Sequence, residues 1–497
     1  MRLTKNIVSN YFNQLWIALA NIISIPLYLT VLGNNSIGLI GFFTALQGVF
    51  SIFDLGFAPI VSQESKKSQL QKITQKSFLS FIKTTNCVYL IISIIIFICL
   101  LAITILYNDV WSWVKDLSSD PDQLWNIATA SSLMIGARYF ETYYRSLFIG
   151  LEFFHEFNFI NFFAIFLRNF GPLILFYFFS PNIVIYFYFQ FFLSVFLSLI
   201  FFLIAYKVKF KKLCYAKIDL NEILKRKKLI IDLFKASVLS VILTQADKML
   251  LPIYLNIEQY SYFILAITIS SGVSMLIAPI TQVIYPKLVK AFIQKNNNEL
   301  ADQFHFSAQL VTLLIGTLSF LIILYSHEIL VLWTSNTDLA DKTSFYLELF
   351  VLGSYINALL WVPYQLQIAM SWMKLSLVTN FFSILLIIPL YIIFLPKYGI
   401  LAAAYIWIGL NLFYFIFSVN IMFNKILSKE RPSWYFFDIL LPSAYMFIIL
   451  VLLKQLFSNS QFNQISLFIT LPILYLLGIT FSFWIFNKLT VRRLLND

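Results

Sequence analysis

The sequence predicts an all-helical protein that crosses a membrane about fourteen times. Of its 497 residues, 60% are hydrophobic and only 12% are charged, whereas a soluble domain carries about 25% charged residues. Apolar runs long enough to cross roughly 30 Å of hydrocarbon as a helix recur from one end of the chain to the other. The mean hydropathy of +0.82 agrees with this pattern. The composition therefore excludes a soluble enzyme and leaves no room for a folded extramembrane domain of the usual size.

The spans are read as apolar windows that end at charges, Gly, Pro or Asn. In chain order the fourteen predicted spans are 7–32, 37–62, 84–106, 124–149, 157–179, 182–206, 232–255, 257–286, 303–325, 343–369, 375–395, 398–424, 437–455 and 464–487. The segment 257–286 is the least regular because it contains Pro279 and Pro286. The first span continues directly into the second without a small-residue cleavage site, so we do not expect it to be a secretory signal.

Lysine and arginine gather in alternate loops, and this predicts the orientation of the chain. The segment 207–231 is the most basic loop, whereas the loops of the opposite side hold only Lys115, Lys342 and Lys397. Because cytoplasmic loops carry the excess of positive charge, we expect both termini in the cytoplasm. The net charge of +12 is thus a topology signal rather than evidence for nucleic acid binding. We interpret 207–231 as a linker, with binding of anionic lipid headgroups as the alternative.

Two pairs of similar segments indicate an internal duplication. Residues 26–59 and 252–286 both open with Pro, an aliphatic residue and Tyr-Leu, and both close with Pro. The stretch "NFFAIFLRNFGPLI" from Asn161 resembles "NFFSILLIIPLYI" from Asn380. The offsets of 226 and 219 residues are close enough for a single duplication with small insertions.

The duplication predicts two pseudo-symmetric six-helix lobes around a central cavity, followed by two C-terminal helices. The expected parts are an N-terminal lobe at 1–206, a basic cytoplasmic linker at 207–231, a C-terminal lobe at 232–424, and a helix pair with its tail at 425–497. Parallel repeats of this kind occur in transporters with a site between two lobes. Pro26 and Pro252 occupy equivalent places, and we expect hinges there because proline kinks helices. They could equally serve only to shape the bundle.

Three charges interrupt the fourth predicted span, in the stretch "LMIGARYFETYYRSLFIGLE". Arg138, Glu141 and Arg145 fall within about 60° of one another on a helix, so they share one face. Glu141 is spaced to pair with both arginines. A lone arginine at mid-membrane costs at least about 2.5–3.5 kcal/mol, so this face should line a bundle interior or a watered cavity. Because guanidinium groups match phosphate oxygens, an anionic substrate is indicated.

Other ionisable residues within the spans extend this candidate site. The candidates for a cationic, substrate-binding lumen are Arg138, Arg145, Arg168 and Lys248. The candidates for coupling to H⁺ or Na⁺ are Asp54, Glu141 and Asp247. Tyr139, Tyr143 and Tyr144 offer flat faces of the kind that pack on sugar rings. Each charge could instead belong to a structural pair that holds helices together.

No pattern for catalysis or metal binding is found. The three cysteines show neither disulfide nor metal-ligand spacing, and His155, His305 and His327 are isolated in the sequence. No phosphate-binding loop of the GxxxxGK[ST] type is present, so we do not expect direct use of ATP. The sequence therefore predicts a protein that is not an enzyme and uses neither cofactor nor metal.

Several stretches resemble one transporter family. The start, "NYFNQLWIALANIISIPLYLTVLGNNSIGLIGFFTALQGVFSIFDLGFAP", is similar to the first two helices of the polysaccharide (O-antigen type) flippases of the MOP transporter superfamily. The Asp-x-Gly pattern that ends their second helix is represented by Asp54, Gly56 and Pro59. "ARYFETYYRSLFIGLEFFHEFN", "QADKMLLP" and "ILVLWTSN" also resemble this family. The likeness covers essentially the whole chain, and the last helix pair is similar to fourteen-span members such as the lipid II flippases.

The resemblance implies a multi-pass protein of the bacterial cytoplasmic membrane. Its expected activity is to move an undecaprenyl-diphosphate-linked oligosaccharide from the inner to the outer leaflet by alternating access, coupled to H⁺ or Na⁺. In this interpretation Arg138, Arg145 and Arg168 hold the diphosphate or acidic sugars. The pathway, whether O-antigen (lipopolysaccharide), capsule or exopolysaccharide, is left open, as is the oligomeric state.

Two alternatives remain beside the flippase. A cation-coupled multidrug extruder of the same superfamily would share the twelve-span core, but cationic drugs favour an acidic pocket. A membrane polysaccharide polymerase or glycosyltransferase would carry its chemistry on a sizeable outer loop or cytoplasmic domain, and the sequence shows neither.

Overall fold

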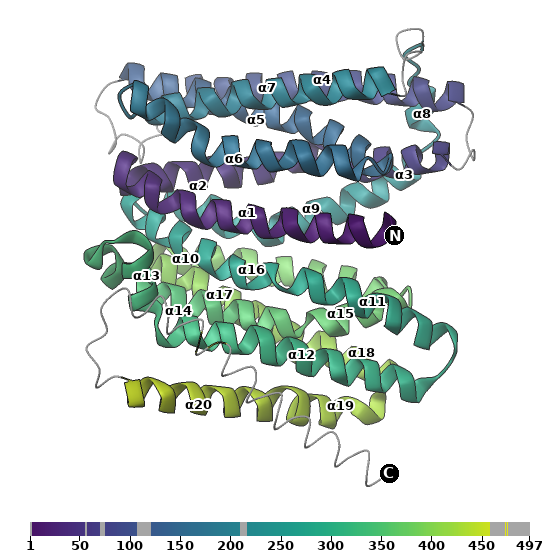
Figure 1. Ribbon diagram of the computed structural model, residues 1–497, viewed down its shortest axis with the longest axis vertical. Helices are drawn as coiled ribbons and strands as arrows, with labels where there is room; N and C mark the ends of the chain where they lie inside the picture. Colours follow the sequence, from purple (N-terminus) through teal and green to yellow (C-terminus); the bar gives the residue numbers. More distant parts are fainter. Residues whose placement is uncertain are drawn as a thin grey trace. The chain divides into compact units, whose positions relative to one another are not determined.

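The computed structural model describes residues 2–54, 57–69, 75–106, 121–208, 216–457, 473 and 475. Within these ranges every regular element is a helix, which confirms the predicted all-helical fold (Figure 1). The chain divides into two compact units, Met1–Ser261 (unit 1) and Tyr262–Asp497 (unit 2).

The described residues of unit 1 form nine α-helices before α10 and two short 3₁₀ turns. They are α1 (Arg2–Leu32), α2 (Asn34–Phe50), η1 (Ser51–Asp54), α3 (Phe57–Gln69), α4 (Gln75–Leu106), α5 (Pro121–Gly150), α6 (Phe154–Phe178), α7 (Ile183–Val208), α8 (Asn221–Leu224), α9 (Lys227–Leu250) and η4 (Leu251–Ile253). Gly33 separates α1 from α2 with a φ of 79°, a backbone conformation that glycine adopts without steric cost.

Helix α5 is the centre of unit 1, because it packs against α3, α4 and α7. The pairs α1–α6 and α2–α9 complete the bundle. Helices α3 and α5 meet at Gly150, where an added Cβ would lie only 2.5 Å from the backbone of Ser62. A larger residue at this position would force the two helices apart, since close-packed interiors do not absorb extra atoms without strain.

Unit 2 begins within α10 (Ile257–Met275). Its further elements are α11 (Ile277–Ile293), α12 (Asn297–Leu324), α13 (Ser326–Thr334), α14 (Thr337–Leu359), α15 (Trp361–Ala369), α16 (Lys374–Tyr398), α17 (Ile400–Phe413), η5 (Tyr414–Ser418), α18 (Val419–Lys425), η6 (Ser428–Glu430), α19 (Arg431–Ser433), η7 (Trp434–Leu440) and α20 (Leu441–Phe457). Two of them, η5 and η7, are π-helical turns, which are rare and often mark functional or strained positions.

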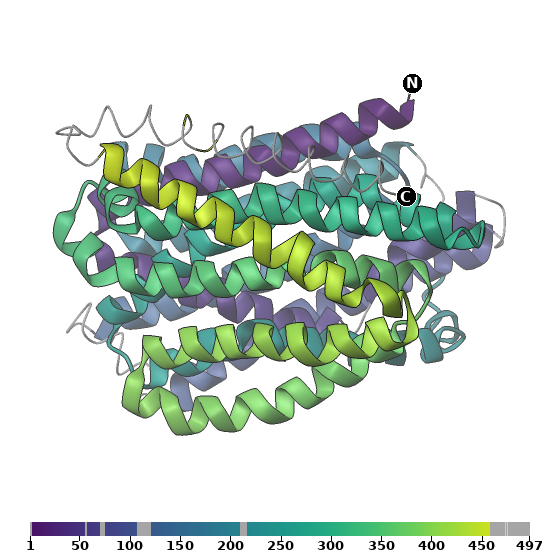
Figure 2. The same ribbon diagram turned by 90° about the horizontal axis from the view of Figure 1, so that it is seen from below.

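Among the candidate membrane spans of unit 2, α12 has the most buried apolar window, and it packs against α11, α14 and α20. Helix α20, yellow in Figure 2, lies against the side of α12. A second pair, α14 and α17, supplies the other half of the core.

Ten of the described segments are long and apolar enough to cross a membrane, and a shorter apolar helix covers Trp16–Leu32. This supports a multi-pass membrane protein. The count of fourteen spans stays a prediction, and the span predicted at 464–487 lies outside the described residues apart from positions 473 and 475. Many large apolar side chains remain exposed, including Ile91, Ile95 and Ile98 on α4. A row of this kind in a membrane helix suits contact with lipid rather than water.

Two predicted spans are not single helices. The span expected at 37–62 ends as α2 at Phe50 and passes through η1 before α3 starts at Phe57. The span expected at 257–286 breaks at Leu276, between α10 and α11. The prediction of one continuous helix for each of these two spans was wrong, because hydropathy does not detect a helix break when the residues on both sides of it are apolar. Both breaks fall inside the segments that the duplication equates, as expected if the two segments share an origin.

The prolines proposed as hinges occupy different local settings. Pro26 lies inside the continuous helix α1, whereas Pro252 lies in the 3₁₀ turn η4 that follows α9. Pro252 therefore ends a helix rather than kinking its middle, a position where its missing N–H costs little. The contact-based division also places α9 with unit 1, because α9 packs on α2. The lobes defined by the duplication stay a prediction.

An ion-pair network attaches the described end of the linker to unit 1. Arg226 donates to Glu64 of α3 at 2.5 Å and to Glu222 at 3.1 Å, and its guanidinium lies 4.5 Å from the ring centroid of Phe81. Lys225 also pairs with Glu222, at 2.5 Å. Burial alone would raise the pKa of Glu222, but bonds from Lys225, Ser77 and Arg226 lower it to about 2. The pKa of Glu64 is also lowered, because Arg226 and Lys67 outweigh its burial.

Replacing Glu222 with glutamine is expected to loosen the linker end. A carboxylate with a lowered pKa stabilises the folded state above its unfolded pKa, and this stability is lost as pH falls through the folded pKa. The network should therefore persist at neutral pH and fail only near pH 2. In the variant, hydrogen exchange of the backbone amides of 216–226 should accelerate about tenfold. Asp232→Asn, at an exposed position on α9, is the control, and equal acceleration there would contradict the assignment.

Candidate functional site

Arg138, on α5, is held by neutral partners. Its Nη1 donates to Oε1 of Gln47 on α2 at 2.9 Å, and its Nη2 donates to Oε1 of Gln190 on α7 at 2.7 Å. No carboxylate pairs with Arg138 among the described residues. Its Nε is buried and has no hydrogen-bond partner. Arg138 therefore has an unused donor and no acidic partner among the described residues, a costly arrangement inside the unit unless an anion binds there.

Arg168 on α6 forms a buried ion pair with Glu141 on α5. The side chain of Arg168 is 17% exposed and that of Glu141 is 5% exposed. Gln190 connects this pair to Arg138, because its Nε2 donates to the carbonyl of Arg168 at 2.7 Å. The charges of α5 and α6 thus belong to one hydrogen-bonded cluster between α2, α5, α6 and α7.

Arg145, two turns further along α5, is held by an amide. Its Nη2 donates to Oδ1 of Asn161 on α6 at 3.2 Å, and its guanidinium lies 5.6 Å from the ring centroid of Phe157. Asn161 in turn donates to Oδ1 of Asn13 on α1 at 3.0 Å. Arg145 also has no carboxylate partner among the described residues.

Among the described residues, the cluster carries three guanidinium groups against one carboxylate, because Arg138 and Arg145 both lie near the pair of Arg168 and Glu141. The structure thus brings together the charged residues predicted on α5 and adds Arg168 to them. The predicted pairing of Glu141 with its neighbours on α5 is wrong, because the carboxylate reaches across to α6. Two guanidinium groups without acidic partners make the cluster suited to an anion such as a phosphate or carboxylate.

The three tyrosines of α5 lie against α4. Tyr139 donates to the carbonyl of Phe53 and Tyr143 to the carbonyl of Ile82, both at 2.7 Å. Both rings pack on Tyr89, with centroid distances of 5.2 and 5.0 Å. Tyr144 bonds to Asn86 at 2.7 Å. Their hydroxyls are thus already engaged, and contact with a sugar would need a rearrangement of this interface.

The candidate coupling carboxylates differ in their surroundings. Asp54 accepts bonds from the hydroxyl of Tyr89 and from the backbone N–H of Ala58, at 3.1–3.2 Å for the latter. No cation pairs with Asp54 among the described residues. Asp247 lies 3.6 Å from Lys248, whose Nζ donates to the carbonyl of Thr244 in the same helix. Lys248 therefore bonds within α9 rather than with the arginine cluster.

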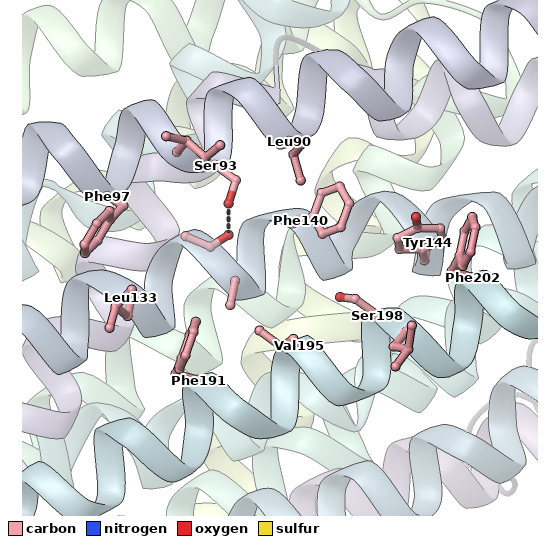
Figure 3. A pocket seen from close by; sticks show the side chains of 14 residues that line it. Leu90, Ser93, Phe97, Leu133, Phe140, Tyr144, Phe191, Val195, Ser198 and Phe202 are labelled. Carbon is pink, nitrogen blue, oxygen red and sulfur yellow. Dashed lines mark hydrogen bonds between the residues drawn. The ribbon is translucent and has the colours of Figure 1, made fainter.

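An apolar groove of about 530 Å³ lies on the other side of α5, between α4 and α7. Leu90 and Phe97 of α4 line one side, and Phe191 and Phe202 of α7 line the other (Figure 3). The hydroxyl of Ser93 donates to the carbonyl of Gly136 at 2.7 Å, so it presents no free donor to the groove. This lining suits hydrocarbon and not a charged headgroup.

Two features of the polar interior were missed by the sequence reasoning. Gln47, Gln190 and Asn161 carry the arginine contacts, but isolated amides in apolar helices give no periodic signal. In unit 2, His305 is isolated in the sequence, but the fold brings two acidic residues from distant segments to it. His305 bonds to Asp438 of η7 and, at 3.0 Å, to Glu430 of η6.

The described residues contain no group of His, Cys, Asp and Glu that could hold a metal ion. Cys87 and Cys99 are free thiols, whereas Cys214 lies outside the described ranges, as does Gly56.

The fold is similar to that of several transporters of known structure. The structure is similar to an inward-closed lipid II flippase, MurJ, with a TM-score of 0.72 and 14% identity over 98% of this chain and 100% of that one. It is also similar to an inward-facing multidrug resistance MATE transporter of the MOP superfamily, with a TM-score of 0.62 and 15% identity over 82% and 95% of the two chains. A third similar structure is a MOP superfamily transporter from Pyrococcus furiosus, described as having a binding pocket of reversed polarity. Its TM-score is 0.54 and its sequence identity is 16%, over 85% of this chain and 94% of that one.

The comparison with curated proteins gave no match. The sequence model described as "Polysaccharide biosynthesis protein" matches residues 3–292, more than half of the chain. This confirms the resemblance read from the sequence, and the solved structures confirm the predicted fold of the MOP transporters. The chain belongs to the polysaccharide biosynthesis protein family and has the fold of the MOP superfamily transporters.

Proposed function

We propose that this protein is a flippase that moves an undecaprenyl-diphosphate-linked oligosaccharide from the inner to the outer leaflet of a bacterial cytoplasmic membrane. The arginine cluster of unit 1 carries the proposal. It offers an anionic headgroup two guanidinium groups without acidic partners, and the unbonded Nε of Arg138, inside an otherwise apolar bundle. The family supports a role in polysaccharide biosynthesis, and the fold supports transport.

In this proposal Arg138 and Arg145 bind the diphosphate or an acidic sugar. Arg168 has a different part, because its charge is matched by Glu141 and its task is to position α5 against α6. The polar headgroup crosses inside the protein, while the lipid tail stays in the bilayer. Alternating access between the two lobes, with Pro26 and Pro252 as hinges and both termini in the cytoplasm, provides the movement.

Asp54 is the strongest candidate for coupling to H⁺. It can take up a proton without breaking an ion pair, whereas protonation of Glu141 would leave Arg168 unpaired. The hydroxyl of Tyr89 donates to Asp54, and the ring of Tyr89 packs on Tyr139 and Tyr143, so Asp54 is connected to the interface between α4 and α5. Asp247, next to Lys248, is the second candidate.

A multidrug extruder is the second candidate function, because a MATE transporter of the same superfamily shares the fold. The arginine cluster opposes it. A cationic drug would meet a net positive charge, and in a low-dielectric interior this repulsion is not screened. A polymerase or glycosyltransferase has no support from the described residues.

Reconstitution into liposomes tests the function. Labelled undecaprenyl-diphosphate-linked oligosaccharide is placed in one leaflet, and its exposure in the other is followed with and without a proton or sodium gradient. The purified protein should transfer it at least about ten times faster than empty liposomes. If no transfer occurs with any gradient while an ion-driven efflux of cationic dyes does, the extruder is the correct function.

A further inference from the structure

A second cavity lies wholly within unit 2, between the end of α14, α15, the first half of α16 and the π-helical turn η5. Its volume is about 240 Å³, slightly below the roughly 300–1,000 Å³ of most small-molecule sites. Its lining contains no Asp, Glu, Lys or Arg. Instead, the walls carry aromatic rings, side-chain amides and hydroxyls. The cavity is therefore polar yet uncharged, and it lies in segments that can span the membrane.

The amides of this cavity are held by one hydrogen bond each. The bonds are Asn357 Nδ2 to Asn411 Oδ1 at 2.7 Å, Ser376 Oγ to Gln367 Oε1 at 3.0 Å, and Tyr414 OH to Asn380 Oδ1 at 3.0 Å. A side-chain amide has both an acceptor oxygen and a donor nitrogen. The second polar group of each amide, on Asn357, Gln367 and Asn380, bonds to no other described residue. The neighbours thus orient the three amides, and each keeps one group for a ligand.

Aromatic side chains provide the other half of the lining. Trp361 and Tyr364 stand on α15 with their ring centroids 6.2 Å apart and their planes at 87°. A pyranose ring has a face of C–H groups that packs on an aromatic surface. Its hydroxyl groups both donate and accept hydrogen bonds, as amides do. The lining therefore fits a neutral sugar better than a phosphate, which would find no cation here.

The internal duplication relates this cavity to the arginine cluster. The offset of 219 residues that equates Asn161 with Asn380 also equates Arg138 with Asn357, Glu141 with Leu360, Arg145 with Tyr364 and Arg168 with Ile387. Each charge of the first repeat is thus matched by a neutral residue in the second.

Both positions bond to an amide of a later helix, although the offset of 219 equates Gln190 with Gly409 and not with Asn411. Arg138 of α5 bonds to Gln190 of α7, and Asn357 of α14 bonds to Asn411 of α17. Under the predicted duplication, this position has a charged form in unit 1 and an uncharged form in unit 2, and in each unit it bonds to an amide of another helix.

We propose that the unit 2 cavity binds a neutral sugar residue of the transported headgroup. This inference rests on the proposed flippase function. Asn357, Gln367 and Asn380 bond to the sugar hydroxyls, and Trp361 packs on the ring face.

The double variant Asn357→Leu/Trp361→Leu tests the assignment in the purified full-length protein. Two probes are compared: the undecaprenyl-diphosphate-linked oligosaccharide extracted from the source cell, and undecaprenyl diphosphate without sugar. The variant should bind the sugar-bearing probe about 10- to 100-fold more weakly than the wild type, because a buried polar contact and a stacking face are both lost. Binding of bare undecaprenyl diphosphate should change less than about twofold. Arg138→Ala should weaken both probes.

Asn420→Leu is the matched control, because this amide of α18 bonds to the carbonyl of Ile416, one turn earlier in η5, and is not among the residues that line the cavity. The milder variant Trp361→Phe keeps the test valid if the double variant does not fold, and it should weaken only the sugar-bearing probe. Equal loss for both probes, or no loss for either, would overturn the sugar assignment while leaving the flippase in place. If the wild type binds neither probe, the proposed function itself fails. In that case, binding of the oligosaccharide released from its lipid tests the cavity alone. If the wild type does not bind this free oligosaccharide, the cavity assignment fails too.

Discussion

Replacing Arg138 with alanine is expected to reduce transfer of the lipid-linked oligosaccharide by about 100-fold or more, because a charged hydrogen bond to a buried group is worth roughly 2–5 kcal/mol. The wild-type guanidinium offers an unbonded Nε and lacks an acidic partner. Its neighbours Gln47 and Gln190 are neutral, so the alanine variant leaves no uncompensated charge behind. Abundance in the membrane should therefore stay near the wild-type level while transport is lost.

Arg138→Lys separates charge from geometry. Lysine keeps the positive charge but has no planar fork, so it cannot bond to Gln47, Gln190 and a phosphate in the same way. Transfer should be intermediate between wild type and alanine. Arg431→Ala is the control, because this arginine bonds to Asn424 in unit 2 and belongs to no part of the cluster. Full activity of Arg138→Ala in liposomes would refute the role given to the cluster.

The sequence was sufficient for the fold class and for the face of α5 that carries the charges. Helical periodicity places Arg138, Glu141 and Arg145 together, and the structure keeps them in one cluster. Periodicity could not name the partner of Glu141, because Arg168 reaches it from another helix. The choice between a neighbour on the same helix and a residue across the interface depends on how α5 and α6 pack.

The neutral polar residues of the site could not be identified from the sequence. Gln190 joins two arginines in unit 1, and Asn357 orients the polar cavity of unit 2 through Asn411. In a sequence with 54 phenylalanines, a single amide alters hydropathy too little to be singled out. Hydropathy also did not predict the helix breaks between α2 and α3 and between α10 and α11, because apolar residues continue on both sides of each break. His305 was also missed, because its acidic partners are more than 120 residues away in the chain.

Breaking the Glu141–Arg168 pair is expected to be the most destabilising change in unit 1. Glu141→Gln leaves Arg168 almost buried without its carboxylate, and removing one partner of a buried pair costs roughly 3–5 kcal/mol. The variant should have a lower Tm in detergent and a lower abundance in the membrane. The pair Lys66–Glu152 is a matched control, since its side chains are 44% and 51% exposed and such pairs contribute only about 0–1 kcal/mol. Glu152→Gln should leave the Tm nearly unchanged.

The double variant Glu141→Leu/Arg168→Met decides what the pair does. Both charges disappear together, so no unpaired group remains, and replacement of a buried pair by apolar residues is often neutral or stabilising. Recovery of both Tm and transport would make the pair a structural connection between α5 and α6, with substrate binding left to Arg138 and Arg145. Recovery of Tm without transport would instead indicate that Glu141 takes part in ion coupling. Asp54 would then no longer be the strongest candidate for the coupling carboxylate. Failure to recover Tm would show that the destabilisation comes from lost packing, because the unpaired charge would no longer be there to explain it.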